Sequence, residues 1–230
     1  MKEIISQCQL SLLPLADPLR AQAMRAYMKN RFEFLGIPAP DRRKACVDII
    51  RQLKTADADE LLQIANDLWD CEQREYQYLA VDILDKHYRR LRPEDVPALL
   101  ALVQQKSWWD TVDGLAGIVG DLLRQNLKGS RDIQAGMDKA LEHPDFWVRR
   151  IALLHQLGWR EQTDVSRLFN YALTLADEKE FFIRKAIGWA LRDYAWHDPV
   201  AIQGFLQENQ GRFSGLTQRE AAKNLKKLGK

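Results

Sequence analysis

The chain has 230 residues, of which 46% are hydrophobic and 29% are charged, a composition typical of a globular protein with one large domain or two small ones. Its formal net charge of +2 does not by itself indicate a nucleic-acid partner, so the distribution of charge matters more than its sum. No apolar run approaches the roughly 18 residues of a membrane span, and three cysteines and four scattered histidines form neither a CxxC nor an HExxH motif, so we expect reduced thiols in the cytoplasm and no metal site.

Hydrophobic spacing is helical along almost the whole chain, and no segment alternates convincingly in the manner of a strand. Pro40-Asp41, Pro93 and His143-Pro144-Asp145 are start signals for helices over residues 42–53, 94–105 and 146–157. Proline and glycine separate about a dozen such segments, most of them roughly 10–18 residues long. The pattern predicts an all-α protein with no linker, and therefore one domain over residues 1–230.

A repeat is visible in the second half of the chain. The stretch FWVRR at residues 146–150 matches FFIRK at residues 181–185, and further steps of the same length reach residue 111 and Tyr76. A period of roughly 35–40 residues predicts an α-solenoid of about six HEAT-like helix pairs, which would form a curved superhelix with a basic concave groove. In this register Asp113 falls where other units carry Val148, Ile183 and Tyr78, so packing does not explain its carboxylate.

The segment SWWDTVD, residues 107–113, combines two tryptophans and two carboxylates. In a helix, Trp109 and Asp113 lie one turn apart on the same face. Ser107 and Asp110 have the spacing of a capping box, which assigns Asp110 to the helix start. Two interpretations stay open: the tryptophans belong to the core, or their faces act together with Asp113 on a ligand.

Basic residues recur in clusters along the chain. Arg149-Arg150 and Arg184-Lys185 hold equivalent repeat positions, so a solenoid would stack them into a ladder suited to the phosphates of a nucleic acid, although a solvated face is the alternative. Gly188, beside Trp189, would admit another backbone or a ligand. The full set of clusters is Arg42-Arg43-Lys44, Arg89-Arg90-Arg92, Arg149-Arg150, Arg184-Lys185 and Lys223-Lys226-Lys227.

Three segments together resemble the AlkD family of bacterial DNA alkylation repair glycosylases. They are residues 26–30 (AYMKN) with 34–37 (FLGI), residues 107–113, and residues 179–189 (KEFFIRKAIGW), and the resemblance covers nearly the whole chain. It implies a monomeric HEAT-like superhelix, cytoplasmic and associated with the nucleoid through DNA binding. Such a protein cradles duplex DNA containing alkylated purines. It hydrolyses the N-glycosidic bond of positively charged N3- or N7-alkylated purines without a cofactor.

The resemblance also implies roles for single residues. Asp113 matches the catalytic carboxylate, Trp109 and Trp189 match the aromatics beside the lesion's sugar, and Arg150 matches an arginine that contacts phosphate. Arg149 departs from the family pattern, which has a neutral polar residue there, and would add a phosphate contact. The expected DNA-binding residues are Arg150, Arg149, Tyr27, Lys185, Arg184, Arg43 and Lys29.

A site of this kind is chemically sufficient for a cationic base. Such a base leaves without protonation, so the protein needs only to stabilise an oxocarbenium-like sugar and orient a water, which a carboxylate and tryptophan faces can do. Two other functions remain possible at this point. A non-catalytic DNA binder would not need Asp113, and a protein-binding scaffold would not need the basic ladder.

Overall fold

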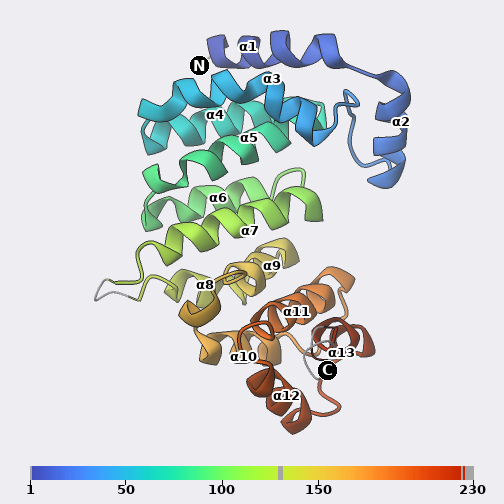
Figure 1. Cartoon of the computed structure of the whole chain (residues 1–230), viewed down its shortest axis with the longest axis vertical. Coiled ribbons are helices and arrows are strands. Elements are labelled where there is room, and N and C mark those ends of the chain that lie inside the picture. The colour runs from blue at the N-terminus through green and yellow to red at the C-terminus, as the bar shows by residue number, and fades with distance from the viewer. Residues whose placement is uncertain (1, 129–131, 224, 226–230) are drawn as a thin grey trace. The chain divides into compact units, whose positions relative to one another are not determined.

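The computed structural model describes residues 2–128, 132–223 and 225, and these residues form thirteen α-helices, five 3₁₀-helices and no β-strand (Figure 1). The prediction of an all-α protein is therefore confirmed. Of the basic clusters, Lys226 and Lys227 lie outside the described residues. The chain divides into two compact units, Met1–Leu102 and Val103–Lys230. One domain, a superhelix and a basic groove stay predictions.

The first unit is a stack of helices in which α1 packs on α3 and α4, and both α3 and α4 pack on α5. Several helix starts follow from local signals, since Asp17 and Asp57 each accept a hydrogen bond from a backbone N–H in the first turn. The elements are α1 (Lys2–Leu12), α2 (Pro18–Tyr27), α3 (Ala39–Gln52), α4 (Ala58–Asp70) and α5 (Arg74–His87), the start of α6 (Val96–Val103), and 3₁₀ turns at Leu13–Leu15, Leu53–Thr55, Tyr88–Arg90 and Pro93–Asp95.

One buried carboxylate and two buried thiols lie inside this first unit. The fully buried carboxylate of Glu75 accepts the backbone N–H groups of residues 35–37 at 2.8–3.1 Å, so it fixes the loop that follows α2. Cys8 on α1 and Cys46 on α3 are completely buried. Burial raises the pKa of the Cys8 thiol to about 12 and that of Cys46 to about 11, because the thiolate would lose its hydration.

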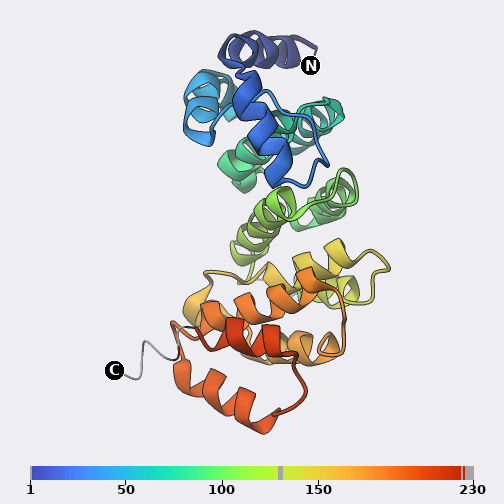
Figure 2. The same ribbon diagram turned by 90° about the vertical axis from the view of Figure 1, so that its right-hand side faces the viewer.

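The second unit contains two rows of helices, and Figures 1 and 2 show this unit from two directions. In one row α7 packs on α9, α9 on α11, and α11 on α13, while α8, α10 and α12 cover them from the other side. The elements are α7 (Trp109–Arg124), α8 (Ala135–Ala140), α9 (Phe146–Leu154), a 3₁₀ turn (Arg160–Gln162), α10 (Val165–Thr174), α11 (Phe181–Tyr194), α12 (Pro199–Glu208) and α13 (Gly215–Ala221).

The repeat predicted for this unit is correct for the starts of two helices and shifted for that of a third. Helices α9 and α11 begin at Phe146 and Phe181, but α7 begins at Trp109, two residues before the predicted equivalent point. The register that aligned Asp113 with apolar positions is therefore wrong. Asp113 is the fifth residue of its helix, as Arg150 and Lys185 are of theirs, so one charged row runs across α7, α9 and α11.

The predicted capping box at the start of α7 is also wrong. The N-cap residue is Trp108, which makes no side-chain capping bond. Asp110 is the second residue of the helix, whereas a capping box needs the acid at the third. The hydroxyl of Ser107 instead donates to the carbonyl of Val103 at 2.6 Å. The sequence pattern assigned this hydroxyl to α7 as a hydrogen-bond acceptor, whereas in the structure it donates to the end of α6.

Candidate functional site

Asp113 and Arg150 form a bidentate ion pair between neighbouring helices. Nε of Arg150 donates to Oδ1 of Asp113 at 2.8 Å and Nη2 donates to Oδ2 at 2.9 Å, so both carboxylate oxygens are held. Nη1 of Arg150 donates to the backbone carbonyl of Phe182 on α11. The arginine is 1% exposed whereas Asp113 is 24% exposed, which places the guanidinium beneath the carboxylate and leaves part of the carboxylate accessible.

The surroundings of Asp113 act on its pKa in opposite directions. Burial raises the pKa above its ordinary value of 3.8, and the hydrogen bonds and charge of Arg150 oppose that rise. The charge of Asp110, three residues earlier, adds to the increase. The guanidinium keeps the carboxylate oriented, since a fork of two parallel bonds allows a single geometry.

The two tryptophans of SWWDTVD have different environments. Trp108 lies edge-on to Trp147 and Phe182, with ring centroids 5.9 and 5.1 Å apart, and so joins an aromatic cluster between α9 and α11. Both tryptophans are partly exposed, but Trp109 begins α7 one turn before Asp113. Of the two interpretations, core packing therefore accounts for Trp108, and Trp109 is the ring that shares a helical face with the carboxylate.

Trp189 on α11 is surrounded by cations. The guanidinium carbon of Arg150 lies 5.4 Å from its ring centroid, Nζ of Lys185 lies at 5.5 Å, and the guanidinium carbon of Arg192 at 5.7 Å. These are distances at which an aromatic face attracts positive charge. The indole Nε1 is buried and has no hydrogen-bond partner in the described part of the chain. Arg150 contacts both the carboxylate of Asp113 and the ring of Trp189, so Trp189 lies beside the Asp113–Arg150 pair.

The predicted basic ladder is present but is largely paired within the protein. Arg149 forms an ion pair with Glu178 at 2.9 Å and donates to two backbone carbonyls. Arg184 donates to the carbonyl of Glu178, and Lys185 pairs with the carboxylate of Glu220 at 2.9 Å. Because the carboxylate of Glu178 lies 29 residues from Arg149 and that of Glu220 lies 35 residues from Lys185, a pattern of basic residues alone could not reveal them.

The remaining predicted DNA-binding residues belong to the first unit. Tyr27 ends α2 with an exposed side chain, and Lys29 follows it with an exposed side chain and a positive φ of 59°. Arg43 on α3 is mostly exposed and donates from Nε to Asp82 at 3.1 Å. The structure thus brings Asp113, Arg150, Lys185 and Trp189 together in the second unit, and their partnership with the first-unit residues stays a prediction.

Sequence reasoning missed Arg192 and Glu220 at this site, and it named Lys223 as part of a basic cluster but not among the DNA-binding residues. Lys185, Trp189 and Arg192 are spaced at i, i+4 and i+7 on α11, so a helical-face argument could have included Arg192. No comparable signal marks Glu220, which accepts hydrogen bonds from Lys185 and Arg192 and belongs to α13.

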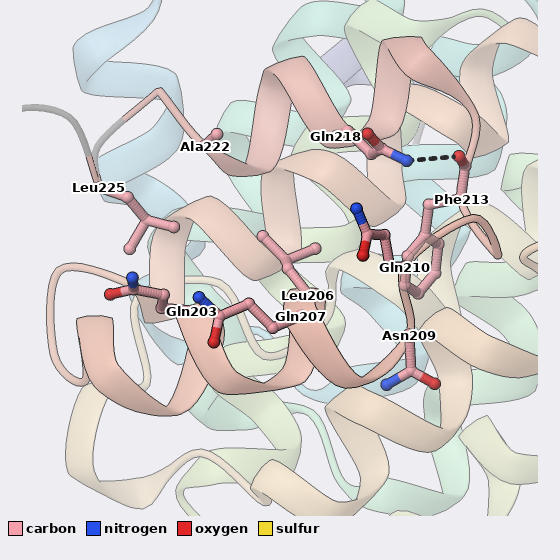
Figure 3. Close-up of a pocket in the computed structure, with 9 residues that line it drawn as sticks. All are labelled: Gln203, Leu206, Gln207, Asn209, Gln210, Phe213, Gln218, Ala222 and Leu225. Carbon is pink, nitrogen blue, oxygen red and sulfur yellow. Dashed lines mark hydrogen bonds between the residues drawn. The ribbon is translucent and has the colours of Figure 1, made fainter.

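Other candidate sites carry less chemistry. No group of three or more metal-binding side chains comes together among the residues the structure describes. None of the described helices is both long and apolar enough to span a bilayer. A pocket of about 300 Å³ between α12 and α13 is lined by amides and apolar groups without a charged side chain, and one of its amides, Gln218, donates to the carbonyl of Phe213 (Figure 3). Such a lining does not suit phosphate.

Comparison with known proteins identifies the family of the chain. Residues 8–225 match the family model described as DNA alkylation repair enzyme. The chain is similar to a solved structure described as a predicted DNA alkylation repair enzyme from Enterococcus faecalis, with 34% sequence identity and a TM-score of 0.82, over 91% of this chain and 96% of that one. No curated protein matches the sequence. Since the family model spans nearly the whole chain, this protein belongs to the DNA alkylation repair enzyme family.

Proposed function

We propose that the protein is a monofunctional DNA glycosylase that hydrolyses the N-glycosidic bond of positively charged N3- or N7-alkylated purines in duplex DNA. The observation that carries the proposal is the geometry of Asp113, a carboxylate that is fixed by Arg150 yet partly accessible. A carboxylate that is already oriented stabilises developing positive charge without reorganising during the reaction.

The chemistry follows from the charge of the substrate. An alkylated purine cation leaves with the electron pair of the glycosidic bond and becomes neutral, so it needs no proton from the protein. The positive charge then moves to the deoxyribose, where Asp113 stabilises it and orients the water that attacks the sugar. The proton of that water passes to solvent or to the carboxylate. A neutral purine would need a general acid to leave, so it is not a substrate.

The tryptophans have supporting roles in this proposal. Trp109 presents its ring from the same face of α7 as Asp113, and an aromatic face attracts a cation by roughly 0.5–2 kcal/mol. Trp189 already borders three cations, so its contribution to a fourth positive charge would be smaller than that of an isolated ring. We therefore assign Trp109 the larger share of the aromatic contribution and Trp189 the position against the sugar-phosphate backbone.

Incubation of the protein with a duplex containing 7-methylguanine, followed by chromatographic detection of the free base, tests the proposal. Release should exceed the spontaneous rate and should cease to do so in Asp113→Asn. A matched duplex with unmodified guanine should release nothing. Tight binding to the methylated duplex without release above background would favour the non-catalytic DNA binder instead.

A further inference from the structure

One buried carboxylate near Trp189 gathers three cations. Glu220 on α13 is only 5% exposed, and its oxygens accept hydrogen bonds from Lys185 at 2.9 Å, from Arg192 at 3.0 Å and from Lys223 at 2.7 and 2.8 Å. Burial alone would raise the pKa of Glu220, but the hydrogen bonds and charges of Lys223 and Lys185 lower it to about 2. The carboxylate is therefore ionised at all ordinary pH values.

The absence of a side chain at Gly188 makes this arrangement possible. A Cβ at that position would lie 2.5 Å from Cβ of Glu220, closer than real atoms approach, and 3.0 Å from the carbonyl oxygen of Thr217. The sequence-based expectation that Gly188 admits another backbone is thus correct, and that backbone belongs to α13. Lys185 and Arg192 flank Gly188 on the same face of α11, so the close approach brings Glu220 within reach of both.

The number of cations exceeds what Glu220 needs. One lysine or arginine would neutralise a buried carboxylate, whereas three leave a local net charge of +2. The side chains of Lys185 and Arg192 remain 25% and 28% exposed, and that of Lys223 is more exposed still, so an anion can reach them. Two of the three also border the ring of Trp189.

We propose that Glu220 is a positioning residue that holds Lys185, Arg192 and Lys223 as a preformed binding site for a phosphate of the DNA backbone beside Trp189. Long basic side chains usually lose conformational entropy when they bind a ligand, and Glu220 has already ordered them. An ammonium group has three N–H donors, so a bond to Glu220 does not exhaust Lys185 or Lys223. The proposal relies on the proposed function only for its ligand, duplex DNA.

Glu220→Gln distinguishes a positioning role from a purely electrostatic one, because the two predict opposite changes in the affinity for DNA. Removing a negative charge should by itself tighten binding to DNA. If Glu220 positions the cations, its loss should instead weaken binding to an unmodified duplex, by roughly 5- to 150-fold when two of the three side chains are released. Fluorescence anisotropy at fixed salt measures the affinity, and Glu220→Asp should restore part of it. Equal or tighter binding by a folded Glu220→Gln would overturn the proposal.

Asp48→Asn is the matched control for the change in charge, since Asp48 is exposed and pairs only with Arg51 among the ion pairs of the described chain. It should not weaken binding.

If Glu220→Gln does not fold, the double variant Lys185→Ala with Arg192→Ala takes its place. The slope of log affinity against log salt should fall by roughly 0.9 for each phosphate that the variant no longer neutralises. An unchanged slope in the double variant would also overturn the proposal, and Arg51→Ala controls for the loss of a cation.

The binding readout separates this proposal from the glycosylase proposal. An unmodified duplex contains no base to excise, so its affinity does not depend on catalysis. A wild-type protein that releases no methylated base, while Glu220→Gln still weakens binding, would refute the glycosylase and support the cluster. If the wild-type protein excises methylated base and Glu220→Gln binds unmodified duplex as tightly as wild type, only the proposed role of Glu220 is refuted.

Discussion

Each unit of the molecule contains a buried arginine–aspartate pair, and the two pairs differ in how their charges balance. In the first unit Asp82 accepts bonds from Arg42 at 3.0 and 3.3 Å and from Arg43 at 3.1 Å. In the second unit Asp113 accepts both of its bonds from Arg150 alone. The aspartates are similarly buried, at 15% and 24% exposure.

Even the aromatic neighbours correspond, because Arg42 lies 4.9 Å from the ring centroid of Tyr78 and Arg150 lies 5.4 Å from that of Trp189. A buried ion pair over an aromatic ring is therefore no sufficient sign of a catalytic site in this fold. Asp82 is outnumbered by its cations and presents a net positive charge, which would repel a cationic sugar. Asp113 is paired with a single cation and is the more accessible of the two, so we propose Asp113 rather than Asp82 as the electrostatic catalyst.

The largest effect is expected from Asp113→Asn. Excision of 7-methylguanine should fall on the order of 10²-fold or more, because a preorganised charge is lost at the point where positive charge develops. The free energy of unfolding should also fall, by about 1–3 kcal/mol, since Arg150 keeps the carbonyl of Phe182 and one side-chain oxygen at position 113 as acceptors but loses its counter-charge. Single-turnover release and denaturant unfolding measure the two effects. Wild-type excision in the folded variant would show that Asp113 is not the catalytic group.

The pH dependence should report the same carboxylate. Only the ionised form stabilises the sugar cation, so excision should fall about tenfold per pH unit below the pKa of Asp113. Because burial raises that pKa, the decline should begin at a higher pH than for an exposed aspartate. Release corrected for spontaneous depurination gives the profile. An identical decline in Asp113→Asn would assign it to another group.

A smaller effect is expected at Trp109. Trp109→Ala should lower excision by roughly 2- to 30-fold, the range of a cation–π contact, with little change in affinity for unmodified duplex. The matched variant is Trp108→Phe, which retains an aromatic ring in the cluster with Trp147 and Phe182. It should leave the excision rate within about twofold, the limit set by an aromatic contact that does not touch the sugar. Equal losses in the two variants would mean that both rings act through packing.

The smallest effect on excision is expected from Asp82→Asn, the counterpart of the catalytic substitution. Unfolding free energy should fall by about 1–3 kcal/mol because Arg42 is buried and loses its anion, while excision measured below the melting transition stays near wild type. A large loss of excision in a folded Asp82→Asn would remove the distinction between the two pairs and place a site residue in the first unit.

Local patterns in the sequence were sufficient for the helices and for part of the site. Helical spacing gave the all-α fold, and the i, i+4 relation joined Trp109 to Asp113 within one helix. The repeat placed Arg150 and Lys185 at equivalent positions because α9 and α11 are matched residue for residue. These successes share a cause, since each depends on contacts within a helix or between identical motifs.

The failures involve partners that are distant along the chain. Nothing near Arg149 or Lys185 in the sequence indicates that Glu178 and Glu220 will pair with them. The two-residue shift of α7 means that 37 residues, not 35, separate Trp109 at the start of α7 from Phe146 at the start of α9, so the two extra residues lie between these two starts. Sequence periodicity predicts the helices but not the exact number of residues between their starts. An error of two residues in that number aligned Asp113 with apolar positions, although it aligns with Arg150 and Lys185 in the structure.

The buried thiols of the first unit have a consequence for a protein that works where DNA is alkylated. Alkylating electrophiles attack proteins mainly at thiolates, and a thiol reacts slowly unless it is ionised and accessible. Cys8 and Cys46 are neither, since both are fully enclosed and their raised pKa values keep them protonated at neutral pH. At these two positions the folded chain is chemically inert toward the same reagents whose damage its family repairs.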